Sequence, residues 1–335
     1  MRFSNLVNYL WYQQNRWFYL LVPASAIYRG IVFLRRCLYR SHIKKNHSFT
    51  VPIVVVGNVT VGGNGKTPFV IFLAELLKNN NYKPGIVIRG YGGKAKAYPA
   101  VVTMDSDPFE VGDEPLLLAK RTACPVVVAP KRAEAVKLLL QRSDCDIVIS
   151  DDGLQHYALA RDIEIALVDG LRKFGNGFCL PAGPLREPVS RLQSVNYVVT
   201  QGRADDNNYD MQLKPGDFIN LADPTQHKAP DSFAGKTLHA VAGIAHPQRF
   251  FTQLKSMGLT IVEHAFPDHH NFQSGDFEKD ALIIMTEKDA IKCRQFATEN
   301  FWYLPVTAEI SPRFVDDFLT FLSETNIRQR SPKQR

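Results

Sequence analysis

The chain has 335 residues, a formal net charge of +7 and the composition of a globular protein, which allows two domains with separate cores. Its five cysteines never form a C-x-x-C pair, which argues against a disulfide framework or structural zinc and favours a reducing compartment. No Asp or Glu precedes Glu75, so the positive charge lies near the N-terminus and the remainder is close to neutral. This distribution excludes a broad nucleic-acid-binding surface.

The N-terminal segment, residues 1–45, is both basic and apolar. Its charge-free stretch, residues 17–28, is shorter than the ~20 residues of a membrane-spanning helix. After Pro23, helical spacing separates an apolar face from a basic one, namely Ile27, Ile31, Leu34 and Leu38 opposite Arg29, Arg36 and Arg40. This pattern predicts an amphipathic helix at a membrane interface, with a helix docked on the protein's own core as the alternative.

Residues 46–203 alternate between apolar strands and helices. The expected strands are 51–57, 83–93, 125–130, 145–153 and 162–169, and the expected helices are 67–80 and 131–142. Such alternation predicts an α/β fold, with a parallel sheet covered by helices on both faces.

A glycine-rich segment, "GNVTVGGNGKTP" at 57–68, joins the first strand to the first helix. It resembles the G-x-x-x-x-G-K-[ST] phosphate loop of P-loop NTPases, although Thr60 replaces the first glycine. Lys66 would reach the β- and γ-phosphates of a nucleotide, and the Thr67 hydroxyl would bind Mg²⁺. The alternative is a glycine-rich turn without a ligand. The predicted nucleotide-binding residues are Thr60, Val61, Gly62, Gly63, Asn64, Gly65, Lys66 and Thr67.

Charged residues follow the ends of several predicted strands, where ligands bind in open α/β sheets. Asp151 and Asp152 end one strand and are candidate Mg²⁺ ligands beside Thr67. Arg89 ends a second strand, and Arg132 starts the helix after a third, which suits an anion site. Further candidates are Asp113 and Glu114 in "VGDEP", where one acid could accept a hydroxyl proton or simply cap a helix.

Beyond residue 203 the pattern changes. Residues 204–225 are polar and turn-rich and suggest a linker or exposed ribbon. Residues 226–326 predict a smaller α/β domain, and 327–335 a disordered tail. Its expected strands are 237–245, 281–290 and 301–306, and its expected helices are 246–258 and 313–325.

Seven motifs in series give the chain a family resemblance. They are "GNVTVGGNGKTP", "RGYGG", "VGDEP", "SDDGLQH", "LPAGPLREP", "FPDHH" and "MTEKDA". Over residues 10–320 the chain resembles the tetraacyldisaccharide 4′-kinases, the lipid A 4′-kinases of Gram-negative bacteria. The resemblance implies transfer of the ATP γ-phosphate to the 4′-hydroxyl of a tetraacyldisaccharide 1-phosphate, forming lipid IVA at the cytoplasmic face of the inner membrane. It implies no protein partner and no nucleic acid.

The resemblance also implies roles for individual residues. Lys66 and Arg132 would act on phosphate, and Asp113, alone or with His269 of "FPDHH", would be the base. The metal would bind Thr67, Asp151 and Asp152. Possible substrate contacts are Asn58, Arg89, Gln155, His156, Arg186 and Glu187.

A membrane-associated P-loop switch ATPase is the alternative function. Val61 argues against it, because it stands where those ATPases place an extra lysine, and a switch would not need both "VGDEP" and "FPDHH". Other histidines, His239, His246 and His264, are interpreted as ordinary surface or core residues.

Overall fold

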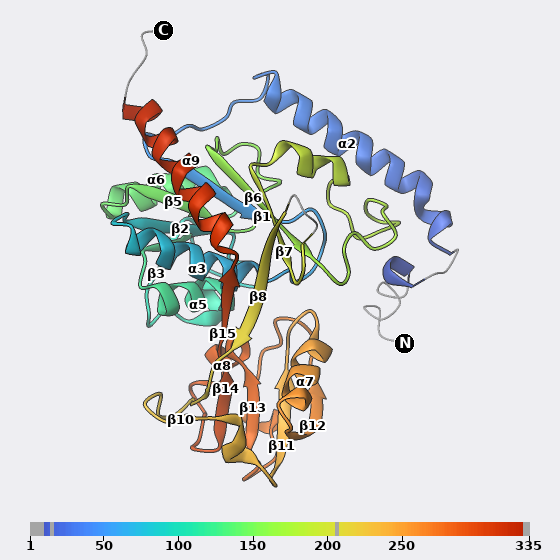
Figure 1. Ribbon diagram of the computed structural model, residues 1–335, viewed down its shortest axis with the longest axis vertical. Helices are drawn as coiled ribbons and strands as arrows, with labels where there is room; N and C mark the ends of the chain where they lie inside the picture. Colours follow the sequence, from blue (N-terminus) through green and yellow to red (C-terminus); the bar gives the residue numbers. More distant parts are fainter. Residues whose placement is uncertain (1–9, 14–16, 205–207, 331–335) are drawn as a thin grey trace.

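The computed structural model describes residues 10–13, 17–204 and 208–330, which form two sheets placed one beyond the other along the long axis of the molecule (Figure 1). Parts of the predicted N-terminal segment, ribbon and tail, at 1–9, 14–16, 205–207 and 331–335, lie outside the described residues.

The larger sheet has nine strands in the order β15-β8-β7-β6-β1-β5-β2-β4-β3. Its seven inner strands are parallel, and the edge strands β3 and β15 are antiparallel to their neighbours. The parallel strands confirm the predicted α/β class. Their bounds are β1 Ile53–Gly57, β2 Pro84–Ile88, β4 Val126–Val128, β5 Ile147–Ser150, β6 Ile163–Asp169, β7 Tyr197–Gln201 and β8 Tyr209–Pro215, with β3 at Ala100–Val102.

Helices cover both faces of this sheet, as its apolar strands require. On β1, Val54 and Val56 face a core shared with α3 (Lys66–Asn79) and α5 (Asp113–Thr122). On the opposite face, Ile53 and Val55 pack with α6 (Arg132–Arg142). Since successive strand residues alternate between faces, strands covered on both sides must be apolar throughout. Two shorter elements complete this part, α4 (Pro108–Val111) and η2 (Val189–Ser194).

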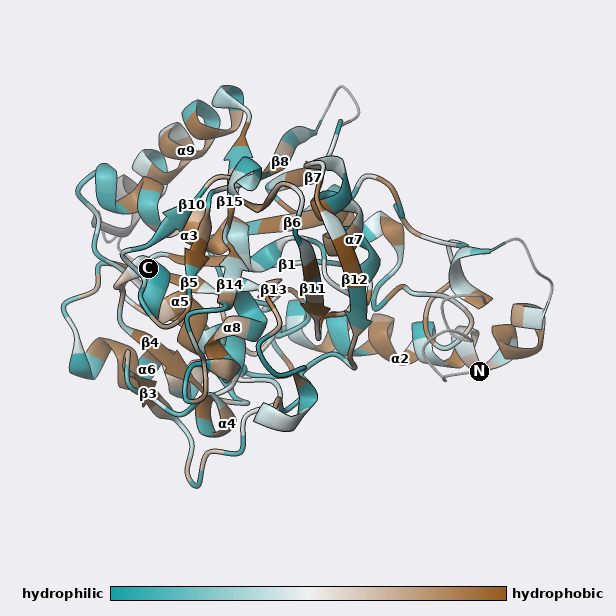
Figure 2. Cartoon of the chain, turned by 90° about the horizontal axis from the view of Figure 1, so that it is seen from below, coloured by the Kyte–Doolittle hydropathy of each residue, from teal (hydrophilic) through white to brown (hydrophobic). Residues whose placement is uncertain are grey.

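The smaller sheet has six strands in the order β10-β9-β14-β13-β11-β12. Its strand β11 is hydrophobic, as its brown colour in Figure 2 shows, and Leu238, Ala240, Val241 and Ala242 are buried. The elements of this smaller domain are β9 Phe218–Asn220, β10 His227–Lys228, η3 Pro230–Phe233, β11 Thr237–Ala242, α7 Pro247–Ser256, β12 Thr260–Ala265, η4 Ser274–Asp276, β13 Ile283–Thr286, α8 Glu287–Cys293 and β14 Phe301–Leu304.

The C-terminal residues depart from the predicted boundaries. The smaller domain was expected to span 226–326, but β15 (Val306–Ile310) pairs with β8 in the larger sheet. The following helix, α9 (Pro312–Arg330), buries Phe314, Phe318 and Leu322 in the larger core. The physical reason is that β8 would otherwise leave an open edge, which β15 covers. Thus β8 lies in the predicted ribbon, and 327–330 of the predicted tail continue α9.

The N-terminal helix α2 (Val22–Arg40), preceded by η1 (Trp17–Leu21), lies along the end of the molecule away from the smaller sheet (Figure 1). On its inner side the buried Ser25 hydroxyl donates to the Cys179 carbonyl at 2.7 Å. On its outer side, Ile27 and Ile31 are more than 60% exposed. Together, 17–40 form a 24-residue helical segment that contains an 18-residue stretch of mean hydropathy 1.5, long and apolar enough to cross a membrane by length and composition alone. The sequence estimate was shorter because it counted only the charge-free stretch.

Candidate active site

The phosphate loop connects β1 to α3. Gly62 and Gly65 have φ angles of 114° and 73°, which suit glycine because it carries no Cβ. Gly65 directly precedes α3, so the first backbone N–H groups of the helix point into the loop. Within the loop, the Asn64 amide donates to the Thr60 hydroxyl at 2.9 Å. Thr60, the departure from the usual pattern, therefore holds the loop in shape through its side chain.

A second segment, 180–188, supports this loop from behind. The Val61 N–H donates to the Pro184 carbonyl at 2.8 Å, and the Arg186 N–H donates to the Val59 carbonyl at 2.7 Å. On the far side of the segment, the Tyr28 hydroxyl of α2 donates to the Arg186 carbonyl at 3.1 Å. The motif "LPAGPLREP" thus links the phosphate loop to the N-terminal helix.

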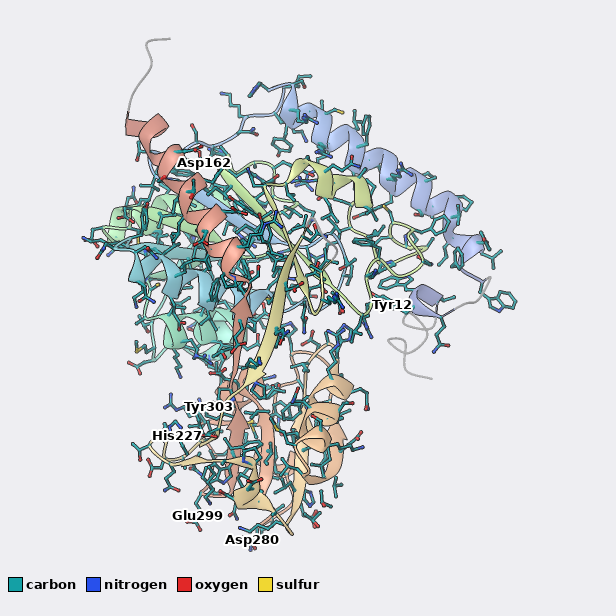
Figure 3. The ribbon with its side chains drawn as sticks, in the orientation of Figure 1. Tyr12, Asp162, His227, Asp280, Glu299 and Tyr303 are labelled. Atoms are coloured by element: carbon teal, nitrogen blue, oxygen red, sulfur yellow. The ribbon has the colours of Figure 1, made fainter. Side chains whose placement is uncertain are left out.

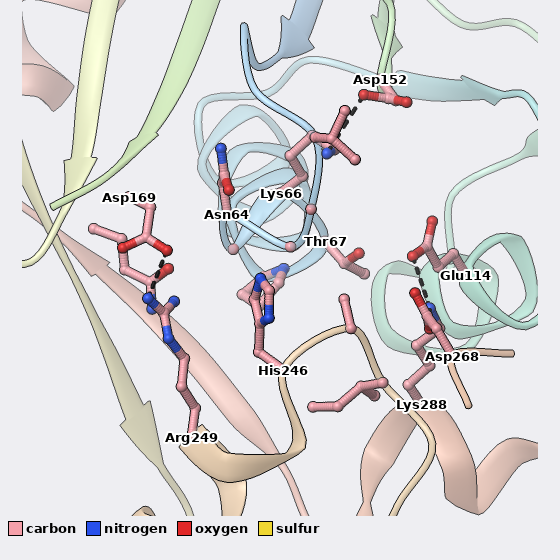
Figure 4. A pocket seen from close by; sticks show the side chains of 18 of the residues that line it. Asn64, Lys66, Thr67, Glu114, Asp152, Asp169, His246, Arg249, Asp268 and Lys288 are labelled. Carbon is pink, nitrogen blue, oxygen red and sulfur yellow. Dashed lines mark hydrogen bonds and ion pairs between the residues drawn. The ribbon is translucent and has the colours of Figure 1, made fainter. Parts of the chain in front are cut away.

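Asp152 faces the loop lysine. Its carboxylate lies 3.4 Å from Lys66 Nζ (Figure 4). It also accepts hydrogen bonds from Arg186 at 3.0 and 3.1 Å. Burial disfavours the charge, but Lys66 and Arg186 outweigh it and lower the pKa of Asp152 to about 2. Asp152 therefore stays ionised, and the two cations are held where a phosphate chain would meet the loop.

Asp151 has a different environment from its neighbour. It is 1% exposed, and its Oδ1 has no hydrogen-bond partner. Burial, and then the nearby Glu114 carboxylate, raise the pKa of Asp151 to about 7. An unpartnered buried carboxylate oxygen is an unsatisfied group that a metal-bound water or a cation would satisfy. Among the described residues no three His, Cys, Asp or Glu side chains cluster as a ready-made metal site, so any Mg²⁺ would depend on nucleotide oxygens as well.

Arg132 and His156 lie next to these acids. The Arg132 guanidinium donates to the carbonyls of Ala129 at 2.9 Å and Asp151 at 3.2 Å, while its Nε has no partner. Burial lowers the pKa of Arg132 to about 10, so it remains charged. Burial and the Arg132 charge lower the pKa of His156 to about 4. The neutral ring accepts a hydrogen bond at Nε2 from the backbone N–H of Arg132 at 3.2 Å. Both residues, with the exposed Arg89, line the same cleft.

Asp113 and His269 are in direct contact, although Asp113 belongs to the domain of the larger sheet and His269 to that of the smaller sheet. His269 Nδ1 is 3.0 and 3.1 Å from the two oxygens of Asp113. Asp113 is 4% exposed at the start of α5, whereas His269 lines the cleft in a left-handed backbone conformation, with φ 59°. The hydrogen bond to Asp113 raises the pKa of His269 against the effect of burial. Nδ1 is engaged with Asp113, whereas Nε2 lies 3.8 Å from Asp268 Oδ1, beyond hydrogen-bond distance, so Nε2 is the ring nitrogen available to a substrate.

Two lysines that the sequence did not single out surround this pair. Lys288 and Lys292, on α8, lie 3.8 and 3.9 Å from Asp113 Oδ2. Lys288 also bonds Glu114 at 3.0 Å and Asp268 at 3.3 Å (Figure 4). Burial of Asp113 opposes ionisation, but His269 and Lys288 outweigh it and lower its pKa. In the sequence, the only sign of these lysines was the charged pattern "EKDAIK", and ordinary surface helices show the same pattern.

His246 was interpreted as an ordinary residue, but it faces the phosphate loop. A Cβ placed on Gly62 would come within 3.2 Å of His246 Nε2. This nitrogen lies 2.8 Å from Arg172, and burial together with Arg172 lowers the His246 pKa to about 4. Arg172 in turn lies over the ring of Tyr12, labelled in Figure 3, at 4.6 Å from its centroid. Close by, Arg249 of α7 forms an ion pair with Asp169, the last residue of β6, at 2.5 Å (Figure 4).

The remaining predicted substrate contacts differ in position. Gln155 lines the cleft and donates to the Asn58 carbonyl and to Glu187, both at 3.0 Å. Glu187 is 1% exposed and also accepts from the Tyr157 hydroxyl. Asn58 is fully buried, and its amide donates to the Gly62 carbonyl within the loop. Asn58 therefore has a bracing position rather than a surface from which to touch a substrate.

One cleft of about 1720 Å³ lies between the two sheets and is lined by Lys66, Asp152, Arg132, His269 and Lys288, with Asp113 and Asp151 buried behind its wall. The cleft extends from the phosphate loop to α2, where Tyr28, Val32 and Arg35 line it. It also reaches the strands that join the two sheets, where its apolar lining is Met211 and Leu213 of β8, Leu304 of β14 and Val306 of β15. This volume exceeds the ~300–1,000 Å³ of a single small-molecule site. The cleft can therefore hold two ligands together, a nucleotide and an acceptor.

Comparisons with known proteins agree on one family. Residues 17–323 match the model of the tetraacyldisaccharide-1-P 4′-kinases. The chain is 48% identical to the tetraacyldisaccharide 4′-kinase of Nitrosococcus oceani over 96% of each chain, and 49% identical to that of Coxiella burnetii over 94% of each. A solved structure, LpxK from Aquifex aeolicus in complex with ATP, aligns with a TM-score of 0.77 and 28% identity, covering 92% of this chain and all of that one.

Proposed function

Because this chain belongs to the tetraacyldisaccharide-1-P 4′-kinase family, we propose that it transfers the γ-phosphate of ATP to the 4′-hydroxyl of a tetraacyldisaccharide 1-phosphate, forming lipid IVA. The observation that carries this proposal is the Asp113–His269 contact at 3.0 Å, facing the same cleft as the phosphate loop. A switch ATPase has no use for a base directed at an acceptor, and the family match supports the kinase over that alternative.

The Asp113–His269 pair is the base in this proposal. The acceptor oxygen attacks the γ-phosphorus, the bond to the bridging oxygen of ADP breaks, and the hydroxyl proton passes to His269 Nε2. Asp113 holds the ring through Nδ1 and stabilises the imidazolium that forms. We assign proton acceptance to His269 because Asp113 is buried and both its oxygens are engaged with Nδ1.

The phosphates of ATP occupy the loop in this proposal. The backbone N–H groups of the loop and Lys66 bind the β- and γ-phosphates, and Arg186 and Arg132 stabilise the charge nearby. Thr67, Asp151 and Asp152 would hold Mg²⁺, which would supply positive charge to offset the negative charge of the phosphates. Asp152 offers an ionised carboxylate at the cleft surface, and Asp151 an unpartnered oxygen behind it.

The acceptor reaches the cleft from a membrane in this proposal. The exposed apolar side of α2, with Ile27, Ile31 and Leu34 all more than half exposed, inserts at the cytoplasmic face of the inner membrane. Tyr28 and Arg35, on the same helix, line the cleft. The lipid acceptor therefore has a short path from the bilayer to the phosphate loop.

The test is ATP turnover with and without a lipid acceptor. With γ-labelled ATP and a tetraacyldisaccharide 1-phosphate in detergent micelles, label should appear in the lipid, and ADP release should depend on the acceptor. Labelled inorganic phosphate released equally fast without acceptor, with none in the lipid, would instead identify a switch ATPase.

A further inference from the structure

A second cavity, of about 330 Å³, lies on the protein side of α2, separate from the cleft. Four arginines and one glutamate line it, Arg36, Arg40, Arg161, Arg191 and Glu164, together with Tyr39, Tyr157, Asn46, Leu159, Ala160 and Ser194. Its volume is at the lower end of the range for ligand sites. It is thus large enough for a small charged group and too small for an acylated disaccharide.

The inner pair of arginines already has a partner. Arg161 and Arg191 both bond Glu164, at 2.9 and 2.5 Å. Arg191 is 2% exposed, and its Nε makes no hydrogen bond, although Glu187 lies at 3.7 Å. Arg161 and Arg191 are therefore already compensated, by Glu164 and, for Arg191, also by Glu187.

The outer pair, from α2, has no acid partner. Arg36 donates to the Ser194 hydroxyl at 2.7 Å, and neither Arg36 nor Arg40 forms an ion pair with any described residue. No acid precedes Glu75 in the sequence, so α2 itself offers none. The lining residues thus carry a net charge of +3 from four arginines and one glutamate. Guanidinium groups bind phosphate oxygens in a bidentate manner and keep their charge.

The position of the cavity suggests the source of the anion. The arginines lie on the side of α2 opposite to Ile31 and Leu34, which are 61% and 58% exposed. A lipid whose acyl chains run along this apolar side would have its headgroup at the level of the helix flank. Lys44, over the Tyr39 ring at 5.9 Å, adds positive charge close by.

We propose that this cavity binds the phosphate group of an anionic membrane phospholipid, distinct from the acceptor, and so fixes α2 on the bilayer. This inference rests on the proposed membrane attachment of α2. Tyr157 separates the cavity from the cleft and lines both. An occupied cavity therefore holds α2 and the wall of the acceptor site in one position.

The test compares two double variants of the full chain that lose equal charge. Arg36→Gln with Arg40→Gln empties the cavity of its unpaired cations, and Arg29→Gln with Lys45→Gln removes two cations of the same segment that do not line it. Glutamine preserves helix propensity. Binding to phosphatidylcholine vesicles with and without phosphatidylglycerol is measured by flotation, without ATP or acceptor.

We expect the cavity variant to bind phosphatidylglycerol vesicles about tenfold more weakly than wild type and the matched variant about threefold more weakly or less. Binding to pure phosphatidylcholine should be the same for all three. Equal losses in the two variants would overturn the proposal, because they would indicate diffuse attraction. It would also be overturned if the cavity variant bound vesicles normally but had a several-fold higher KM for the disaccharide in phospholipid-free micelles, since the cavity would then hold the acceptor's phosphate.

A third variant separates this inference from the proposed function. Ile31→Glu with Leu34→Glu should lose binding to both vesicle types, since it removes the apolar side of α2. If it binds as wild type does, the attachment of α2 is wrong and the lipid site with it. Kinase activity in micelles, measured separately, is unaffected by that outcome.

Discussion

The phosphate loop and the Asp113–His269 pair face one cleft but are assembled in opposite ways. The loop is one continuous segment between β1 and α3, braced by hydrogen bonds within itself and by segment 180–188 of the same domain. The pair joins residues 156 positions apart, one from each side of the cleft. A local motif keeps its geometry wherever the domains lie, whereas the pair exists only while the domains are held together. Substitutions in the loop and substitutions in the Asp113–His269 pair should therefore have different effects on activity.

The largest expected effect lies in the loop. Lys66→Ala should lower kcat by about 10³-fold or more, because phosphoryl transfer depends mainly on positioning and charge stabilisation. Lys137→Ala, on the exposed side of α6, is the matched control and should leave kcat unchanged. Steady-state kinetics with saturating acceptor measures both. A Lys66→Ala enzyme within a few-fold of wild type would remove the loop lysine from the mechanism.

The pair should lose activity as a unit. Asp113→Ala and His269→Ala should each lower kcat by about 10²- to 10⁴-fold, while nucleotide affinity stays nearly the same. The double variant should be little worse than the poorer single variant, because the two residues serve one proton transfer. Multiplicative losses would mean independent roles, and a large fall in ATP affinity for Asp113→Ala would assign this residue to the metal.

The neighbouring histidine offers a control for this double-mutant cycle. His270 lies in the same loop but pairs with Asp276 at 3.1 Å. His270→Ala should therefore retain most of the activity. A loss as large as that of His269→Ala would show that the loop, and not the imidazole, is what the reaction needs.

The pH dependence should distinguish which member of the pair accepts the proton. If His269 Nε2 does, the ring must be neutral, so kcat/KM should fall as the pH drops through the His269 pKa. Since Asp113 raises that pKa, the acidic limb should lie above the ordinary value of about 6.5. Asp113→Asn removes the stabilising charge, so the limb of the residual activity should move to lower pH. A limb that Asp113→Asn leaves unmoved would exclude His269 as the titrating group.

The sequence identified the parts of the site that are local. Apolar runs located β1, β2, β4, β5 and β6 of the larger sheet and β11, β13 and β14 of the smaller one, and "VGGNGKT" located the loop, because these features depend on residues close together in the chain. The other strands, among them β7, β8 and β12, were not predicted. Asp113 was a candidate base from the residues alone, but its pairing with His269 was expected only from the family resemblance. Because they are 156 positions apart, no local sequence pattern predicts that they meet.

The features that the sequence missed depend on long-range placement. Nothing in "FLTFLSE" indicates which sheet α9 covers, since an amphipathic helix fits any apolar face. Lys288 and Lys292 become important only because α8 packs beside α5 and meets Asp113. His246 likewise gains its position from the contact of its domain with the loop. Periodicity reports which side of an element is buried, but not against which partner.

The smallest expected effect concerns the contacts that hold the two sides together. Arg121 of α5 donates to both oxygens of Glu287 on α8, at 2.8 and 2.6 Å, and the two side chains are 23% and 15% exposed. Glu287→Gln weakens this bridge without changing the loop. We expect kcat to fall about two- to fivefold, since partly exposed ion pairs contribute about 1 kcal/mol or less. Binding of ATP alone should be unaffected, because the loop keeps its own geometry. Arg142→Gln, exposed on α6, removes one charge elsewhere as a control. A Glu287→Gln enzyme that weakens ATP binding more than it lowers kcat would contradict the division between a self-contained loop and a pair that depends on domain contact.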